Sequence, residues 1–115
     1  MNITKILTRN DLGMTKSHQD GIHWPLEIIH AGFFPALNPA EHNPRTLINI
    51  TFLDSGETGA GHYIHYNNKF TTGGTRNEFR LTGLTATLLG LGARPGDRIE
   101  VSHTPDRLNI SIKIN

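Results

Sequence analysis

The chain has 115 residues, enough for one domain that buries roughly 65% of the surface its unfolded form would expose. Its 12 glycines and 6 prolines favour many short elements joined by turns over a helical bundle, and its lack of cysteine excludes disulfides and thiolate metal sites. A net charge of +1 names no partner, and neither a transmembrane run nor a signal-peptide core is present. We therefore expect a soluble, cytoplasmic protein with a single domain over residues 1–115 and no membrane partner.

The first third of the chain alternates short apolar runs with polar turns. Residues 3–7 mix branched aliphatic side chains with threonine and predict a strand. Residues 10–20 are polar and predict a loop longer than most connections. Residues 21–24 predict a second strand, followed by Pro25, which suits the first turn of a helix because its missing N–H is not needed there. We expect that helix to be short and to stop at Gly32.

Strand signals dominate the remainder of the chain. We expect a loop over residues 38–44, strands over 46–53 and 62–66 around a turn at 54–61, a polar loop over 67–75, a strand over 78–82, a helix over 85–91 ended at Gly92, and strands over 98–103 and 108–114. About seven short strands and two short helices with this turn spacing predict a mainly β fold, a small barrel or sandwich.

The sequence contains little that indicates a catalytic site or a metal site. His62 and His65 are three apart on an expected strand, so their side chains point to opposite faces and do not easily share one ion. Asp106 and Lys113 faintly resemble a PD…(D/E)xK nuclease site, but Ser111 stands where the second carboxylate should be. Neither a GxSxG elbow nor a Walker-type phosphate loop occurs, so we expect no cofactor, no metal and no catalytic residue.

The positive charge is densest in the two long loops, near positions 9–18 and 69–80, which also carry side chains that read nucleic acid. Arginine pairs with guanine, asparagine with adenine, and glutamate accepts from cytosine N4. Arg76, Asn77 and Glu78 supply these three groups in a row. Thr75 can bond phosphate, and glycines let a loop backbone approach phosphates closely. Two solvated polar loops without a ligand remain the alternative interpretation.

Within these loops the sequence resembles a known family. Residues 10–21, followed by Pro25, are similar to the first arm of the EcoRII-type N-terminal effector domain. Residues 64–69 and 75–82 are similar to its second arm, in the expected order. The resemblance implies an open, seven-stranded DNA-binding pseudobarrel, a fold shared with plant B-three transcription-factor domains. In that family, two arms clasp double-stranded DNA from the major-groove side, and cleavage belongs to a separate nuclease domain or chain.

Carried onto this chain, the resemblance and the loop chemistry together define a set of expected DNA-binding residues. The set is Arg9, Asn10, Lys16, Ser17, His18, His23, Lys69, Thr75, Arg76, Asn77, Glu78 and Arg80. Arg76 and Arg80 are expected to read guanine or brace phosphates, while Asn77 and Glu78 select among bases or fix those arginines. The chain departs from the family pattern at Gly74 and Phe79, where family lysines stand, and at His23, where a tyrosine stands. These departures put the base preference and the strength of phosphate contact in doubt.

The expected function is sequence-specific binding of double-stranded DNA, as the non-catalytic recognition module of a restriction endonuclease system. The expected partners are DNA and a nuclease domain or chain, which leaves open whether the chain is a fragment or a stand-alone relative of a larger nuclease. A small β-barrel module that binds a protein or a small carbohydrate-like ligand is the alternative. DNA binding should weaken steeply with salt, whereas an apolar ligand site should not.

Overall fold

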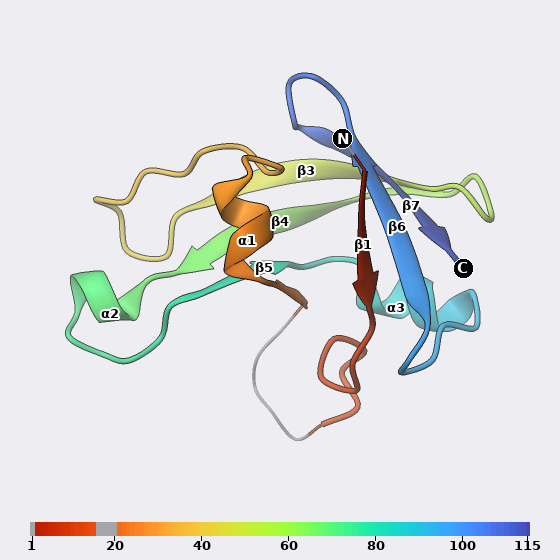
Figure 1. Ribbon diagram of the computed structural model, residues 1–115, viewed down its shortest axis with the longest axis horizontal. Coiled ribbons are helices and arrows are strands. Elements are labelled where there is room, and N and C mark those ends of the chain that lie inside the picture. Colours follow the sequence, from red (N-terminus) through yellow and green to blue (C-terminus); the bar gives the residue numbers. More distant parts are fainter. Residues whose placement is uncertain (1, 16–20) are drawn as a thin grey trace.

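The computed structural model describes residues 2–15 and 21–115, which form one curled sheet with three short helices (Figure 1). The strands are β1 (Asn2–Ile6), β2 (Ile22–Trp24), β3 (Arg45–Phe52), β4 (Thr58–Tyr66), β5 (Glu78–Leu81), β6 (Arg98–His103) and β7 (Asn109–Ile114). The helices are α1 (Leu26–His30), α2 (Asn68–Thr71) and α3 (Thr85–Gly90). The expected mainly β architecture of seven strands is confirmed, with one short helix more than the two expected.

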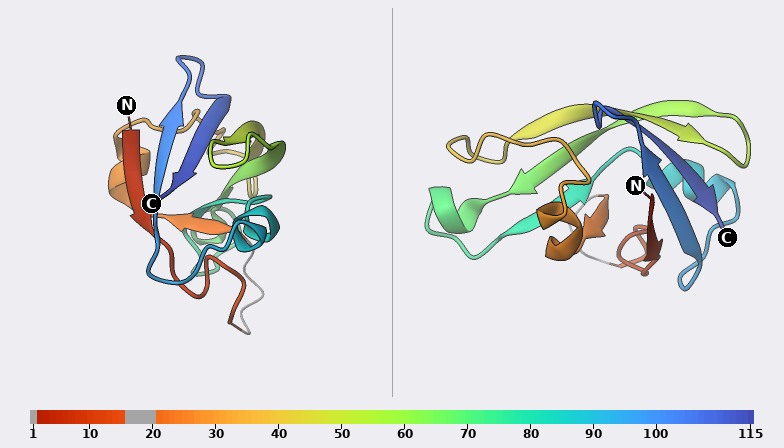
Figure 2. Two further views of the ribbon diagram at one scale, coloured as in Figure 1. Left: turned by 90° about the vertical axis from the view of Figure 1, so that its right-hand side faces the viewer. Right: turned by 45° about the horizontal axis from the view of Figure 1, so that its top comes forward.

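The sheet is open, and the strands at its two edges, β1 and β2, follow one another in the chain. The strand order is β1-β6-β7-β3-β4-β5-β2. All neighbouring pairs are antiparallel except β3 and β7, which run parallel. The two views of Figure 2 show the sheet curling so that β1 and β2 approach one another from opposite edges. The two edge strands, β1 and β2, therefore face one another across the opening of the pseudobarrel.

Alternating side chains fill the interior of the curl. In β3, Ile48, Ile50 and Phe52 are buried, and between them lie half-buried or exposed polar residues. β6 and β7 bury alternate aliphatic residues in the same way. Burying one such side chain contributes about 1.5–3 kcal/mol, so this alternation fixes the register of each strand. The period-2 pattern that predicted these strands is thus the pattern of their inward faces.

β4 begins earlier than its sequence pattern predicts. The expected turn over residues 54–61 is shorter, because the Gly-rich stretch from Thr58 onward pairs with β3 in regular register. Gly61 has a second constraint, since a Cβ placed there would lie 1.8 Å from the Thr82 carbonyl oxygen. Residues with almost no side chain give no alternation signal, so backbone pairing and close approach decided this strand.

A buried asparagine shapes the start of the 67–75 segment. The sequence predicts only a loop there, but the structure contains the short helix α2. Asn67 is 1% exposed. Its Oδ1 accepts from the Asn43 N–H at 2.8 Å, and its Nδ2 donates to the Glu41 carbonyl at 2.7 Å. Its own N–H donates to Asn43 Oδ1 at 3.1 Å. These reciprocal bonds join the 38–44 loop to the base of α2.

The helices are short, six residues at most. Throughout the described part of the chain, none has the length and apolar character to span a bilayer.

A pair of glycine substitutions in β4 tests the close approach to Thr82. We expect Gly61→Ala to lower the free energy of unfolding by about 3 kcal/mol, because backbone must move to admit the methyl group. Gly59→Ala is the matched control, since no heavy atom lies within 4 Å of a Cβ there. Urea unfolding should leave Gly59→Ala within about 0.5–1 kcal/mol of the parent. Equal effects of the two substitutions would contradict the assignment.

Candidate nucleic-acid interface

The two predicted loops leave the sheet next to one another in its strand order. The first runs from the end of β1 to β2, and the second joins β4 to β5, the strand that pairs with β2. Residues 7–15 of the first loop and the whole second loop lie along the lower side of the view in Figure 1. Of the expected site residues, Lys16, Ser17 and His18 lie outside the described residues.

A buried carboxylate anchors the first loop. Asp11 is 1% exposed, and its Oδ2 accepts from the Thr8 N–H at 3.0 Å. The same oxygen lies 3.2 Å from Lys5 Nζ on β1, while Oδ1 accepts from the His23 N–H on β2 at 3.1 Å. Asp11 therefore ties both edge strands of the sheet to the base of the loop. A buried carboxylate is stable only with such partners.

The described part of the first loop is internally bonded. An Arg9 terminal nitrogen donates to the Met14 carbonyl at 3.3 Å, and Arg9 is exposed. Asn10 Oδ1 accepts from the Thr15 hydroxyl at 2.8 Å. The Asn10 side chain thus shapes the loop, and the Arg9 guanidinium lies at its surface.

A carboxylate between two arginines forms the centre of the second loop. Glu78 Oε1 accepts from Arg76 Nε at 3.0 Å, and Oε2 accepts from Arg80 Nε at 2.7 Å. The Arg76 guanidinium also lies 3.8 Å from the centroid of the Tyr66 ring, a cation–π contact. We term Tyr66, Arg76, Glu78 and Arg80 the arginine face of the β4–β5 ribbon.

The two arginines of this face differ in exposure. The Arg76 side chain is 31% exposed, whereas that of Arg80 is 3% exposed and donates from Nη1 to the Gly21 carbonyl at 3.1 Å. The Arg76 terminal nitrogens have no hydrogen-bond partner within the part of the chain that the structure describes. Arg76 therefore presents its outer fork to the surface, and Arg80 fixes Glu78 and the β2–β5 edge from within.

These contacts determine the ionisation states of Glu78 and of the neighbouring His23. Burial raises the pKa of Glu78, but the hydrogen bonds and charges of Arg80 and Arg76 outweigh it and hold the pKa below its ordinary value. For His23, burial and then the charges of Arg80 and Lys5 lower the pKa below 6.5. Glu78 is consequently ionised at neutral pH and His23 neutral, so any contact of His23 with DNA would be a hydrogen bond rather than an ion pair.

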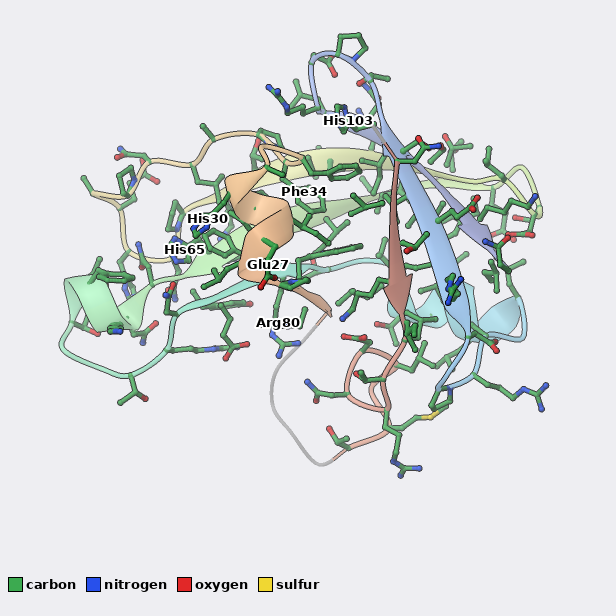
Figure 3. All side chains as sticks on the ribbon, viewed as in Figure 1. Glu27, His30, Phe34, His65, Arg80 and His103 are labelled. Carbon is green, nitrogen blue, oxygen red and sulfur yellow. The ribbon has the colours of Figure 1, made fainter. Side chains whose placement is uncertain are left out.

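The opposite face of the same ribbon is aromatic. The rings of Phe34, Tyr63, Phe79 and His65 form a nearly parallel column, with centroid distances of 4.5, 6.0 and 3.9 Å along it. At its outer end His65 Nε2 lies 2.8 Å from Asn77 Oδ1. We term this side the ring face; Figure 3 labels Phe34 and His65. Asn77 therefore belongs to the ring face, apart from Arg76 and Glu78.

The remaining expected residues of the second loop are exposed. Lys69 lies on α2, with Nζ 5.8 Å from the Phe70 ring centroid, and Thr75 lies at the loop surface. The Lys69 N–H donates to the Arg76 carbonyl at 3.0 Å and closes the loop on itself. The structure thus gathers Arg76, Glu78 and Arg80 in one cluster with His23 alongside on β2, and leaves Lys69 and Thr75 at the loop surface.

Two departures from the family pattern have structural roles. Phe79 fills a place in the ring column between Tyr63 and His65. A Cβ at Gly74 would lie 3.1 Å from Asn68 Cβ, so the loop is tight there. Sequence reasoning missed Asp11, Tyr66 and His65 as site residues. An aspartate inside a loop and alternating rings are common signals, and only the spatial contacts give them a role.

Histidine and carboxylate side chains form no group of three or more able to hold a metal within residues 2–15 and 21–115.

The chain is similar to known proteins both in sequence and in fold. The family model described as restriction endonuclease EcoRII, N-terminal, matches residues 1–91. The solved Arabidopsis FUS3–DNA complex is similar in structure, with a TM-score of 0.70 and 20% identity over 98% of this chain and 94% of that one. A hypothetical Arabidopsis thaliana protein is similar with a TM-score of 0.58 and 14% identity, over 100% of this chain and 89% of that one. No curated protein sequence matches the chain. The structural likenesses show the fold, the expected pseudobarrel of plant B-three domains.

Substitution of the two arginines separates a supporting role from a surface role. We expect Arg80→Ala to lower the free energy of unfolding by about 3 kcal/mol, because it removes the buried hydrogen bonds to the Gly21 carbonyl and to Glu78 Oε2. Arg76→Ala should cost less than about 1 kcal/mol, since its side chain is partly exposed. Chemical denaturation measures both, and a larger loss for Arg76→Ala would overturn the distinction.

The lowered pKa of Glu78 predicts a pH dependence. A carboxyl whose pKa is lower in the folded state stabilises the protein above its unfolded value, 4.5, and loses that contribution as the pH falls through the folded value. We therefore expect Glu78→Gln to be less stable than the parent at about pH 7 and the difference to shrink at about pH 3. Urea midpoints at both pH values measure it. A difference that persists unchanged in acid would show that the charge of Glu78 contributes nothing.

Proposed function

Because this chain belongs to the family of EcoRII N-terminal domains, we propose that it binds double-stranded DNA sequence-specifically through its two loops, as the recognition module of a restriction endonuclease system. Two observations agree with this proposal: the solved relative of the same fold is a complex with DNA, and the arginine face carries base-reading side chains. On this proposal the loops enter the major groove as two arms. The domain itself is non-catalytic, and cleavage belongs to another domain or chain.

The fixed Arg76 fork is the observation that carries the proposal. Its Nε is held by Glu78 and its plane by Tyr66, while its terminal nitrogens remain for a ligand. An arginine fork matches guanine O6 and N7, and a preorganised side chain loses less entropy on binding. A planar guanidinium already braced on one side is well suited to a base edge on the other.

Glu78 and Arg80 then act mainly by holding other side chains in place. Glu78 holds both guanidinium groups, and the buried side chain of Arg80 holds Glu78 in place. A direct base contact by buried Arg80 would require the β2–β5 edge to open. We therefore assign the first base contact to Arg76 and the supporting role to Arg80. Exposed Lys69, Thr75 and Arg9 are placed to contact phosphates, which position the duplex without reading its sequence.

Selection of bound duplexes from a random pool tests the proposal. The selection is run at two salt concentrations and without divalent metal. A short motif that survives higher salt supports specific readout and names the site. A flat pool whose binding disappears at higher salt leaves a basic surface without specificity, and no binding at either salt contradicts the proposal.

Three variants on the selected site separate reading from positioning. Arg76→Ala should weaken the preferred site by about 1–3 kcal/mol and relax one base position. Lys69→Ala should weaken all sequences about equally and lower the salt slope by about 0.9. Arg94→Ala, an exposed arginine in the turn before β6, is the control and should change neither. Filter or anisotropy titrations measure the three; unchanged binding by Arg76→Ala would remove the assigned base contact.

A further inference from the structure

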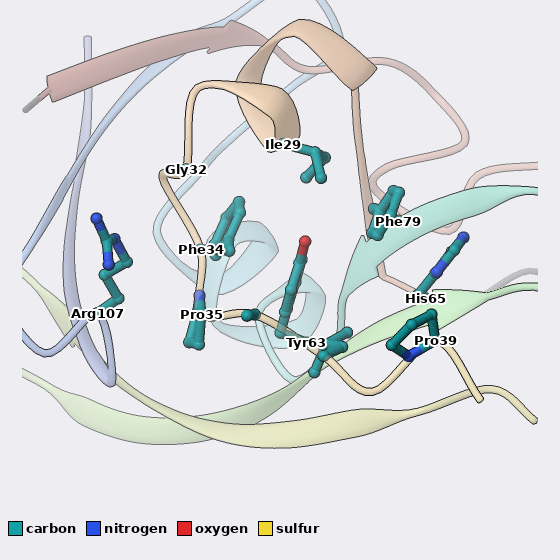
Figure 4. A pocket seen from close by; sticks show the side chains of 11 residues that line it. Ile29, Gly32, Phe34, Pro35, Pro39, Tyr63, His65, Phe79 and Arg107 are labelled. Atoms are coloured by element: carbon teal, nitrogen blue, oxygen red, sulfur yellow. The ribbon is translucent and has the colours of Figure 1, made fainter. Parts of the chain in front are cut away.

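A pocket of about 470 Å³ opens on the ring face, between the segment after α1 and the β4–β5 ribbon (Figure 4). Its walls include Phe34, Pro35, Tyr63, His65, Phe79 and Arg107. This volume falls in the range of small-molecule sites, which combine apolar and aromatic walls with a few polar groups. The pocket contains no residue of the arginine face, so it is separate from the surface assigned to DNA.

One polar group inside the pocket has no partner. Tyr63 is 2% exposed, and its hydroxyl makes no hydrogen bond within the described part of the chain. Figure 4 shows that hydroxyl pointing into the space between Ile29, Phe34 and Phe79. Burial raises the pKa of Tyr63, so the hydroxyl stays protonated and can both donate and accept. Because the hydroxyl faces the pocket, a ligand there can bond it without displacing a protein partner.

A cation lies at one end of the same pocket. Arg107 is exposed, and its side chain makes no ion pair or hydrogen bond to the described residues. Its backbone has φ 61° within the turn between β6 and β7, where its N–H donates to the Thr104 carbonyl at 2.9 Å. The turn therefore holds Arg107 at the rim of the pocket. The lining of the pocket includes no carboxylate that would neutralise the guanidinium.

We propose that this ring-face pocket binds a nucleotide. The base lies against Pro35, Pro39 and the edges of the Phe34 and Phe79 rings, because the faces of those rings are already stacked within the column. The Tyr63 hydroxyl bonds the polar edge of the base, and Arg107 pairs with the phosphate, for which the guanidinium fork is suited. A nucleotide combines a planar ring, a hydrogen-bonding edge and an anion, the three features that the pocket offers. The proposal does not rest on the DNA-binding function.

Titration of the 115-residue protein with the four deoxynucleoside monophosphates and their nucleosides tests the site by calorimetry. We expect saturable binding of at least one monophosphate. Tyr63→Phe should weaken it about fivefold through loss of one neutral hydrogen bond, and because that hydroxyl has no partner the variant keeps its fold. Arg107→Ala should remove about tenfold of affinity for the monophosphate and leave the nucleoside unchanged.

Matched controls stand outside the pocket. Tyr66→Phe removes the hydroxyl of the other tyrosine, on the arginine face, and Arg94→Ala removes another exposed arginine. Both should bind the monophosphate as the parent does. Binding that Tyr63→Phe and Arg107→Ala leave unchanged, or that the controls weaken equally, would overturn the proposal.

The nucleotide has two sources, free in solution or turned out of a bound duplex. A duplex carrying 2-aminopurine distinguishes them, because its fluorescence rises when the base leaves the stack. A rise that Tyr63→Phe abolishes identifies the duplex as the source. Monophosphate binding without such a rise identifies the free nucleotide, which we expect because the pocket and the arginine face lie on opposite sides of the ribbon. If neither probe engages the pocket, the proposal is wrong.

Discussion

The structure depends on a carboxylate that closes an open sheet. The first two strands of the pseudobarrel lie at opposite edges of the sheet, and their described residues do not pair with one another across its opening. Asp11 supplies the connection, with an ion pair to Lys5 on one edge and a hydrogen bond from the His23 N–H on the other. Because a buried charge is costly without partners, loss of either contact would destabilise Asp11 and with it the closure of the sheet. The base of the first loop is thereby fixed with respect to β2, and β2 in turn pairs with the strand that carries Arg80.

The β4–β5 ribbon uses its two faces for different chemistry. Strand alternation sends Tyr66, Glu78 and Arg80 to one side, and Tyr63, His65 and Phe79 to the other. One face holds charge in a braced cluster suited to a polar, anionic surface. The opposite face stacks rings beside a pocket into which the Tyr63 hydroxyl points. The His65–Asn77 contact joins the ring column to the loop that also carries Arg76, so the two faces meet at one residue.

Much of the fold followed from periodicity. Strands such as β3 and β6 bury every second side chain, and that pattern is written directly in the order of residues. The end of the third helix near Gly92 was also predictable, because glycine commonly follows a helix in the left-handed conformation. Gly92 adopts that conformation, with a φ of 87°. The early start of β4 and the presence of α2 were not, because Gly-rich backbone pairing and the buried Asn67 leave no periodic signal. For the site, the sequence predicted which residue types the second loop contributes. It did not predict how those residues divide between the arginine face and the ring face.

The sequence by itself determined the mainly β class, the seven strands, and the family to which the two loops belong, because side-chain alternation and local motifs are properties of neighbouring residues. Tertiary structure alone decided that Arg80 is interior while Arg76 reaches the surface, that Asp11 joins two edges, and that four rings from distant segments align. Each of these depends on which segments approach across the sheet. Whether a charge is buried or exposed is set by partners that lie far away in the chain, as Gly21 lies from Arg80.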